Sequence, residues 1–304
     1  MARLLAVSDL HFPEYQRELH RLTSILGSTS IDALLLAGDF LSSPLENRVR
    51  SLLRVIRGAY KGPIIAVWGN HEHYLTRNRL RKGWTSLDQL GLLKTILEEY
   101  NVHILDDTGP ERIKDVSLAG TVGWYDYSYG PPGYTREDYE RCNPYGVPLG
   151  VIEACEHRHW NPLCPPRWRN DCIYIRLPIP NEEYARLNAE NLRRQLAEAE
   201  PPVIAVLHHA PRRELLRYTG RSVEDFDLAY AGFPMLGDAI DEYRDKTITT
   251  IYGHLHTRSK SRATRINGVT YINAYYTAPG PQGFVLIDTA IEEGGYKVKH
   301  QVIP

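Results

Sequence analysis

Gly69-Asn70-His71-Glu72 directly follows the apolar run Pro63–Trp68, and this junction decides how the rest of the sequence is interpreted. Four other short apolar runs end in a similar way, at Asp9-Leu10-His11, Gly38-Asp39, His208-His209 and Gly253-His254-Leu255-His256. Short apolar runs bounded by polar turns are typical of buried β-strands. In open α/β sheets, ligands bind at the carboxyl ends of the strands. The sequence therefore predicts that five loops meet at one functional site.

The composition is that of an ordinary globular protein. The chain has 304 residues, of which 42% are hydrophobic and 24% charged, and its formal net charge is -1. A net charge near zero gives no overall attraction to nucleic acid or to acidic membranes. The apolar stretch at the N-terminus is too short for a signal peptide, and no run approaches the roughly 18 apolar residues of a membrane span. These features predict a soluble, cytoplasmic protein with no membrane partner.

The apolar periodicity alternates between strands and helices. Helices are predicted over Tyr15–Leu26 (ended by Gly27), Glu46–Tyr60, Ser86–Tyr100, Asn181–Ala199 and Met235–Tyr243. Additional short strands are predicted near Val102–Leu105, Arg112–Lys114 and Val116–Val122, with a hairpin turn at Ile266–Val269 and a last strand near Phe284–Ile287. The β-α-β-α-β order of the N-terminal part predicts a parallel sheet with right-handed crossovers. The later change to strands joined by turns indicates a second sheet, so the fold class is α/β.

Residues 124–180 show no clean period and are rich in Trp, Tyr, Pro and Cys. We interpret them as an insertion that folds over one end of the sheets, within a single domain spanning residues 1–304. The segment contains all the cysteines of the chain, which are Cys142, Cys155, Cys164 and Cys172. No pair has C-x-x-C spacing, so the zinc-ribbon signal is absent. Reduced thiols, one or two disulfides, and a structural metal remain as alternatives.

The five loops carry the side chains that bind borderline divalent metals. Asp9 and His11 are two residues apart, so on a continuing strand they point the same way, and His254 and His256 have the same spacing. The two oxygens of Asp39 can bridge two ions, and Asn70 offers a neutral oxygen. Two ions about 3.5–4 Å apart clamp the attacking and leaving oxygens of a phosphoryl centre. This chemistry predicts hydrolysis of phosphoric esters by a metal-bound hydroxide.

The five blocks resemble the calcineurin-like metallophosphoesterase superfamily, whose pattern is D-x-H, G-D, G-N-H-D/E, a lone H and G-H-x-H, in that order. All five are present and together span residues 9–256. The resemblance implies a four-layer αββα sandwich of two mixed β-sheets flanked by helices. It also implies two divalent ions, which can be Mn, Fe, Zn or Ni, with Mn the first choice.

The resemblance further implies a role for each residue of the motifs. One metal would be held by Asp9, His11, Asp39 and His256, and the other by Asp39, Asn70, His208 and His254. His208 is preferred over His209 because the family's ligand is the first histidine after the strand. His71 would not bind metal but would act as a general acid or stabilise the charge of the phosphoryl oxygens.

Residues beside these ligands are candidates for the substrate pocket. They are the aromatic residues Phe12, Tyr74 and Tyr125, together with His209, and core packing is the alternative for each. Basic residues that follow two of the loops could bind a second phosphate, but a solvated loop face is preferred for them; they are Arg212, Arg213, Arg217, Arg258, Lys260, Arg262 and Arg265.

The sequence thus predicts a dinuclear metal-dependent phosphodiesterase or phosphatase that acts on a small-molecule phosphoester. A nuclease is the first alternative, but nucleic acid is not the favoured partner because the net charge is near zero. A non-catalytic scaffold of the same fold is the last alternative, because every ligand of the pattern is present.

Overall fold

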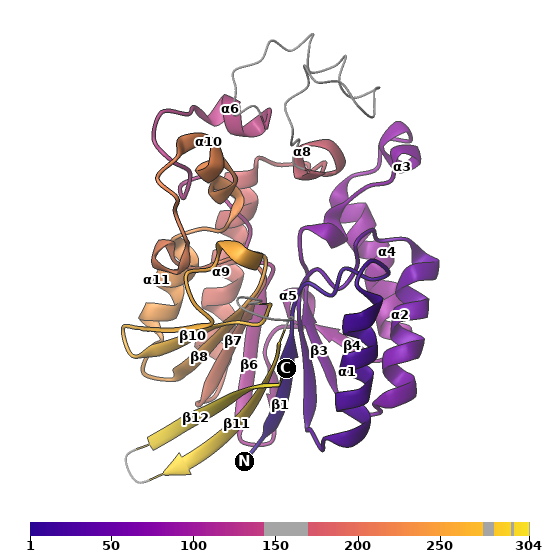
Figure 1. Cartoon of the computed structure of the whole chain (residues 1–304), viewed down its shortest axis with the longest axis vertical. Coiled ribbons are helices and arrows are strands. Elements are labelled where there is room, and N and C mark those ends of the chain that lie inside the picture. Colours follow the sequence, from indigo (N-terminus) through magenta and orange to yellow (C-terminus); the bar gives the residue numbers. More distant parts are fainter. Residues whose placement is uncertain (143–169, 276–282, 293–294, 304) are drawn as a thin grey trace.

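Two six-stranded sheets lie face to face, with helices on the outer face of each (Figure 1). The computed structural model describes residues 1–142, 170–275, 283–292 and 295–303. Helices α1, α2 and α4 cover one sheet, and α9 and α11 cover the other (Figure 1). The predicted α/β class and its four-layer αββα arrangement are confirmed.

The first sheet has the strand order β12-β11-β1-β2-β3-β4. Its strands are β1 (Arg3–Val7), β2 (Ala33–Ala37), β3 (Ile64–Val67), β4 (Val102–Ile104), β11 (Phe284–Glu292) and β12 (Gly295–Ile303). Strands β1 to β4 are parallel, while β11 pairs antiparallel with both β1 and β12. The carboxyl ends of β1, β2 and β3 therefore lie at the same edge of this sheet.

The second sheet has the order β5-β6-β7-β8-β10-β9. Its strands are β5 (Glu111–Ile113), β6 (Val116–Thr121), β7 (Val203–Leu207), β8 (Thr247–Tyr252), β9 (Ala263–Ile266) and β10 (Val269–Asn273). The four central strands are parallel, and β5 and β9 are antiparallel strands at the two edges. The sheet is mixed, as predicted, and β9 and β10 form the hairpin expected around Asn267-Gly268.

The central strands are apolar throughout because both of their faces are buried. In β1, Leu4 and Ala6 belong to the core between the two sheets, and Leu5 and Val7 pack under the helices. Alternate residues of one strand thus contribute to two different cores.

The main helices have an apolar stripe that packs on the sheets. They are α1 (Gln16–Ser28), α2 (Glu46–Ala59), α4 (Ser86–Glu99), α9 (Asn181–Glu198) and α11 (Met235–Glu242). The prediction that Gly27 ends the first helix was wrong, because α1 continues to Ser28 before the N–H of Thr29 closes it on Ile25. In the described ranges, no helix is both long enough and apolar enough to cross a bilayer.

Several elements were not predicted, most of them short helices. Helix α5 (Leu105–Thr108) has only four residues, too few to show a helical period. Strand β11 runs past Ile287 to Glu292 and is followed by β12, so the prediction that the fold ends near Ile287 was wrong. Four further short helices are α3 (Arg77–Arg81), α6 (Arg136–Glu140), α8 (Asn170–Tyr174) and α10 (Ser222–Asp225).

The predicted insertion at 124–180 is described in part, and α6 and α8 lie at one end of the molecule, beyond the sheets (Figure 1). Cys142 and Cys172 form a disulfide whose Cα atoms are 6.3 Å apart. Of the three alternatives for the cysteines, a disulfide is therefore correct for this pair. Cys155 and Cys164 lie outside the described residues.

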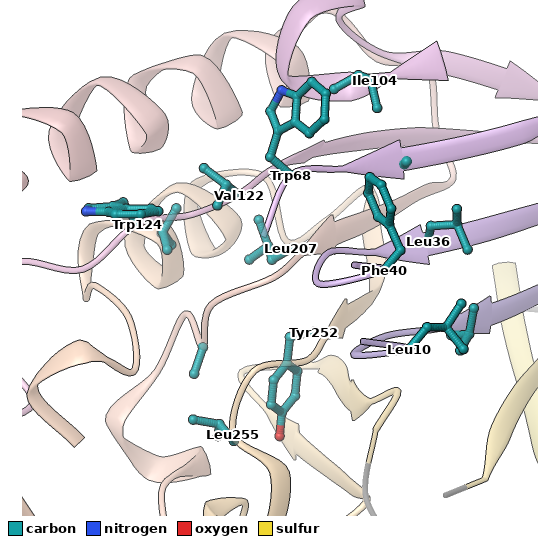
Figure 2. Packing of buried hydrophobic residues seen from close by; sticks show 14 of the residues in the cluster. Leu10, Leu36, Phe40, Trp68, Ile104, Val122, Trp124, Leu207, Tyr252 and Leu255 are labelled. Atoms are coloured by element: carbon teal, nitrogen blue, oxygen red, sulfur yellow. The ribbon is translucent and has the colours of Figure 1, made fainter. Parts of the chain in front are cut away.

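A layer of apolar side chains lies next to the loops that follow the strands (Figure 2). Leu10, Phe40 and Trp68 follow β1, β2 and β3, and Val122 and Tyr252 lie at the ends of β6 and β8. All are almost completely buried. Each of the first three is next to, or two residues from, a predicted metal ligand, so the packing of this layer fixes the backbone that carries the polar residues.

Candidate metal centre

The predicted ligands come from the loops after β1, β2, β3, β7 and β8, and main-chain hydrogen bonds join these loops to one another. The N–H of Asp9 donates to the carbonyl of Gly38 (3.1 Å), and that of Gly253 donates to the carbonyl of His208 (3.0 Å). The first bond joins two loops of one sheet, and the second joins two loops of the other. The loops are therefore held in fixed positions at the carboxyl ends of the strands.

Five of the predicted ligands have a left-handed backbone conformation. Their φ angles are 56° at Asp9, 43° at His11, 49° at Asp39, 62° at His254 and 46° at His256. Such a conformation in a non-glycine residue costs about 1–3 kcal/mol and is concentrated at functional sites. The strain is an independent sign that these loops are shaped for chemistry rather than for stability.

Asp9, His11 and His256 form the first of three groups that could hold a metal ion. The Nε2 atom of His256 lies 3.0 Å from Asp9 Oδ1 and 3.3 Å from the Nε2 atom of His11. Asp9 is fully buried and His11 nearly so, whereas His256 is partly exposed. Two imidazole nitrogens and one carboxylate oxygen thus converge from β1 and β8.

Asp39, His208 and His254 form a second group that could hold a metal ion. His208 Nε2 lies 3.4 Å from Asp39 Oδ1 and 3.0 Å from Asn70 Oδ1. Asp39 Oδ2 instead faces His11 and His71, whose Nε2 atoms are 4.0 and 3.8 Å away. The two oxygens of one buried carboxylate therefore face two different groups of ligands.

The donor set fits divalent cations. Ligand atoms about 2.0–2.2 Å from one ion lie about 3.0–3.5 Å apart at tetrahedral or octahedral angles. The distances of His256 Nε2 from Asp9 Oδ1 and His11 Nε2 fall in this range. So do those of His208 Nε2 from Asp39 Oδ1 and Asn70 Oδ1. The Nδ1 atom of His208 donates to the carbonyl of Ala37 (2.9 Å), which leaves a lone pair on Nε2 facing the amide oxygen of Asn70. Two acceptors at 3.0 Å repel each other unless a proton or a metal ion lies between them.

The electrostatics of the site also favour added positive charge. Burial alone would lower the pKa of His208, but the carboxylates of Asp39 and Asp9 more than offset this and raise the pKa to about 9. Burial would raise the pKa of Asp39, but His208 and His71 hold it well below its usual range. Without a metal, a proton on His208 supplies the charge that the carboxylates require, and a divalent ion would replace that proton.

Residues behind the ligands hold them in place. The Oγ atom of Ser8 lies 2.5 Å from Asp9 Oδ2, and the N–H of His254 donates to the same oxygen (3.0 Å). The buried carboxylate of Glu72 accepts hydrogen bonds from the N–H groups of Asp39 (2.9 Å), Leu41 (3.1 Å) and Gly69 (2.9 Å). Glu72, the last residue of the G-N-H-E block, therefore shapes the loop that carries Asp39.

Two glycines of the motifs are required by close contacts. A Cβ atom at Gly69 would collide with the backbone nitrogen and Oδ1 of Asp39. A Cβ atom at Gly253 would collide with Ser8 Oγ and would lie 2.5 Å from Asp9 Oδ2. Only glycine leaves space for these carboxylates beside the backbone.

His71 occupies a different environment from the buried ligands. Its Nδ1 atom lies 3.1 Å from the carbonyl of Ser42, so the Nδ1–H donates there and Nε2 is left facing Asp39. Its side chain is 20% exposed, compared with 2% for Asp39. His71 also forms a third metal-binding group with His11 and Asp39. Its place in the pocket lining allows His71 to contact a substrate.

A pocket of about 290 Å³ opens beside the ligands. Its lining includes the predicted residues Asp39, Asn70, His71, His254 and His256. It also includes Asn170, Asp171, Asp227 and Arg258. The pocket wall thus contains the carboxylates of Asp39, Asp171 and Asp227 and the guanidinium of Arg258.

The four candidates for substrate binding have different outcomes. Tyr74 lines the pocket, but its hydroxyl donates to Asp171 Oδ1 (2.6 Å). Tyr125 is outside the pocket lining, where it stacks on Trp124 with ring centroids 4.9 Å apart. Phe12 packs against the core and is also absent from the lining. For Tyr125 and Phe12, core packing, which was the alternative to substrate binding, is therefore the better description.

His209 is completely buried behind the site, with its ring centroid 4.3 Å from that of His254. Its Nδ1 atom donates to the carbonyl of Val122 (3.0 Å). Burial, followed by the nearby His208, lowers the pKa of His209 to about 3, so the ring is neutral. Among the described residues its Nε2 atom makes no hydrogen bond. His209 therefore supports the ring of His254 rather than facing the pocket.

The most important residue that the sequence analysis missed is Asp171. Its carboxylate accepts a hydrogen bond from Asn70 Nδ2 (2.9 Å) across 101 residues of sequence. It stands in a segment without periodicity, and nothing in the local sequence except the adjacent Cys172 distinguishes it. Asp227, which lies in the five-residue 3-10 helix Phe226–Tyr230 and also lines the pocket, was missed as well.

Comparison with known proteins agrees with this geometry. A model of the calcineurin-like phosphoesterase family matches residues 2–258. The solved structure of phosphopantetheinyl hydrolase (PptH) from Mycobacterium tuberculosis has a TM-score of 0.63 and 21% identity, covering 89% of this chain and 88% of that one. TT1561 of Thermus thermophilus has a TM-score of 0.51 and 12% identity, covering 99% and 98%. At these identities the two structures share the fold with this chain. No curated protein matches the sequence.

Proposed function

The chain belongs to the calcineurin-like phosphoesterase family, and on this basis we propose that it hydrolyses small-molecule phosphoric esters with the help of two divalent metal ions. The observation that carries the proposal is the position of Asp39. Its Oδ1 faces His208 and its Oδ2 faces His11 and His71, so one carboxylate joins two groups of ligands.

The proposed ligands are those expected from the sequence. Asp9, His11, Asp39 and His256 would hold one ion, and Asp39, Asn70, His208 and His254 would hold the other. When bound, the ions would supply positive charge to the phosphoryl oxygens and lower the pKa of an attacking water. Mn²⁺ is our first choice of metal, although this donor set also suits Fe, Zn²⁺ and Ni²⁺.

The protein's own residues would position the ester and handle the leaving group. We assign His71 as the group that protonates the leaving oxygen or stabilises the charge on the phosphoryl oxygens. Its Nδ1–H is held by the carbonyl of Ser42, which directs Nε2 toward Asp39 and the pocket. A general acid of this kind is typically worth about 10²–10⁴ in rate.

The pocket favours a small substrate over nucleic acid. Its volume of about 290 Å³ is near the lower end of the range for small-molecule sites. Its described wall contains the carboxylates of Asp171 and Asp227, which would repel a polyanionic backbone.

The cytoplasmic location stays a prediction.

The test is hydrolysis of bis-p-nitrophenyl phosphate and p-nitrophenyl phosphate, first with metal-stripped protein and then with Mn²⁺ restored. We expect no turnover without metal and recovery with it. Preference for the diester identifies a phosphodiesterase, and preference for the monoester a phosphatase. A phosphopantetheinyl ester should be included, because one protein of the same fold is named for that activity. Absence of turnover with all these esters and every divalent metal would contradict the proposal.

A further inference from the structure

Asn70 can serve as a metal ligand only if its amide oxygen, and not its amide nitrogen, faces the metal site. The two atoms are nearly identical in shape, so the hydrogen-bond partners decide the orientation. The Nδ2 atom donates to Asp171 Oδ1 (2.9 Å) and to Tyr74 Oη (3.1 Å). The Oδ1 atom is therefore directed to His208 Nε2 (3.0 Å).

Asp171 is well suited to impose this orientation. Its side chain is 4% exposed, and its Oδ1 atom also accepts a hydrogen bond from the hydroxyl of Tyr74 (2.6 Å). A carboxylate oxygen at this position accepts from the NH₂ group of Asn70 and would repel its carbonyl oxygen. A flipped amide would lose the bond to Asp171 and would turn two N–H donors toward the metal site.

The disulfide anchors the short helix that carries Asp171. Helix α8 has five residues, and Cys172, the next residue after Asp171, is bonded to Cys142, two residues after the end of α6. Two residues further along α8, the carbonyl of Tyr174 accepts a hydrogen bond from the N–H of Leu75 (2.8 Å). The covalent link and the main-chain hydrogen bond both lie within three residues after Asp171, so they hold the helix that carries it.

We propose that Asp171 is a positioning residue that fixes the amide of Asn70 for metal binding, and that the Cys142–Cys172 disulfide holds Asp171 in place. The inference rests on the proposed role of Asn70 as a ligand. It connects a segment outside the family motifs to the proposed metal centre, through the hydrogen bond between Asp171 and Asn70.

The experiment measures Mn²⁺ binding to metal-stripped protein, with two sites expected in the wild type. Asp171→Ala should weaken one of the two sites by about 10–100-fold, the usual effect of removing a group that orients a ligand. Asp171→Asn should restore most of the affinity, because its amide oxygen can still accept from Asn70 and Tyr74. Asp238→Ala, which removes an exposed carboxylate of α11 away from the pocket lining, is the matched control and should leave both affinities unchanged.

The covalent link is tested separately with the double variant Cys142→Ser and Cys172→Ser. In this double variant, the site that Asp171→Ala weakens should also lose Mn²⁺ affinity, but by a smaller factor. The reason is that the main-chain hydrogen bond between Leu75 and Tyr174 remains. Thermal unfolding of every variant shows whether the protein is folded. If the double variant is not folded, the same titration on wild-type protein after dithiothreitol treatment replaces it. That reaction transfers two electrons and two protons to the disulfide, giving two thiols and cyclic oxidised dithiothreitol.

Asn70→Ala separates failure of this inference from failure of the proposed function. If Asn70→Ala keeps two sites of wild-type affinity, Asn70 is not a ligand and the proposed ligand set is wrong. If Asn70→Ala weakens a site but Asp171→Ala does not, only the positioning role is overturned. If Asp171→Asn is as defective as Asp171→Ala, a hydrogen-bond acceptor at this position is not sufficient, which also overturns the positioning role. If the Mn²⁺ affinity is unchanged without the Cys142–Cys172 disulfide, the disulfide does not hold Asp171 in place, and that part of the proposal is overturned.

Discussion

The backbone N–H of His71 donates to Asp39 Oδ1 (2.9 Å), while Nε2 of the same residue lies 3.8 Å from Asp39 Oδ2. The two consecutive motif blocks G-D and G-N-H-E are therefore joined at the centre of the site. Asp39 is almost fully buried, whereas His71 reaches the pocket. Because of this contrast in exposure, we expect substitution of Asp39 to remove the metal ions and substitution of His71 to leave them bound.

Asp39→Ala should abolish metal binding and turnover together, because among the described residues only Asp39 has oxygens that face both proposed sites. Metal content per chain, measured by elemental analysis after loading with Mn²⁺, should fall from two to nearly zero. Asp238→Ala is a suitable control, since Asp238 is exposed on α11. A metal content like that of the wild type in Asp39→Ala would exclude the bridging role.

His71→Ala should retain both metals but lose turnover by about 10²–10⁴. The reason is that Nε2 of His71 faces the pocket, while its Nδ1–H donates to the carbonyl of Ser42. Metal analysis and steady-state kinetics on the same preparation check this. Because His71 also forms a metal-binding group with His11 and Asp39, loss of an ion would instead identify it as a ligand.

Gly253→Ala should lower Mn²⁺ affinity by about 10–100-fold, because the new Cβ atom would collide with Ser8 and displace the Asp9 carboxylate. Isothermal titration of metal-stripped protein measures the change. The matched control is Gly58→Ala in α2, where a Cβ atom meets nothing within 4 Å. That substitution should leave the affinity unchanged and stabilise the helix by up to about 1 kcal/mol. Equal affinities for Gly253→Ala and wild type would show that the loop tolerates the methyl group.

The strands and the proposed ligands could be predicted because both depend on local sequence. A run such as Val203–Leu207 identifies a buried strand, and the histidine that follows it must lie at the end of that strand. The partner of Asn70 could not be predicted in this way. Asp171 reaches Asn70 only because the chain folds back over 101 residues, through a segment whose irregular sequence encodes no period.

Aromatic residues beside the motifs show the same limit. Tyr125 follows a strand and was a reasonable candidate for a pocket wall. In the structure its ring lies between Trp124 and Tyr230, with centroids 4.9 and 5.2 Å away. Tyr230 is distant in sequence, so the aromatic cluster that draws Tyr125 into the core has no local signature.

The last prediction concerns His73, which lies near the site but neither lines the pocket nor joins a metal-binding group. Its Nδ1 atom donates to the carbonyl of Gly69 (2.7 Å), and its Nε2 atom accepts from the hydroxyl of Tyr184 (3.0 Å). The neutral ring satisfies both bonds. Burial lowers the pKa of His73 to about 4, so the folded protein resists protonation that the unfolded chain accepts near pH 6.5.

A lowered pKa in the folded state means that the stabilisation is complete above about pH 6.5 and is lost as the pH falls toward 4. At pH 5 the loss due to this one group should be about 2 kcal/mol. His73→Gln should be less stable than wild type at pH 7, and the difference should shrink by about that amount at pH 5. Urea unfolding of metal-free protein at the two pH values measures it. His20→Gln, at an exposed position of α1, should change little at either pH. If His73→Gln and wild type lose equal stability on acidification, His73 is not the group that resists protonation.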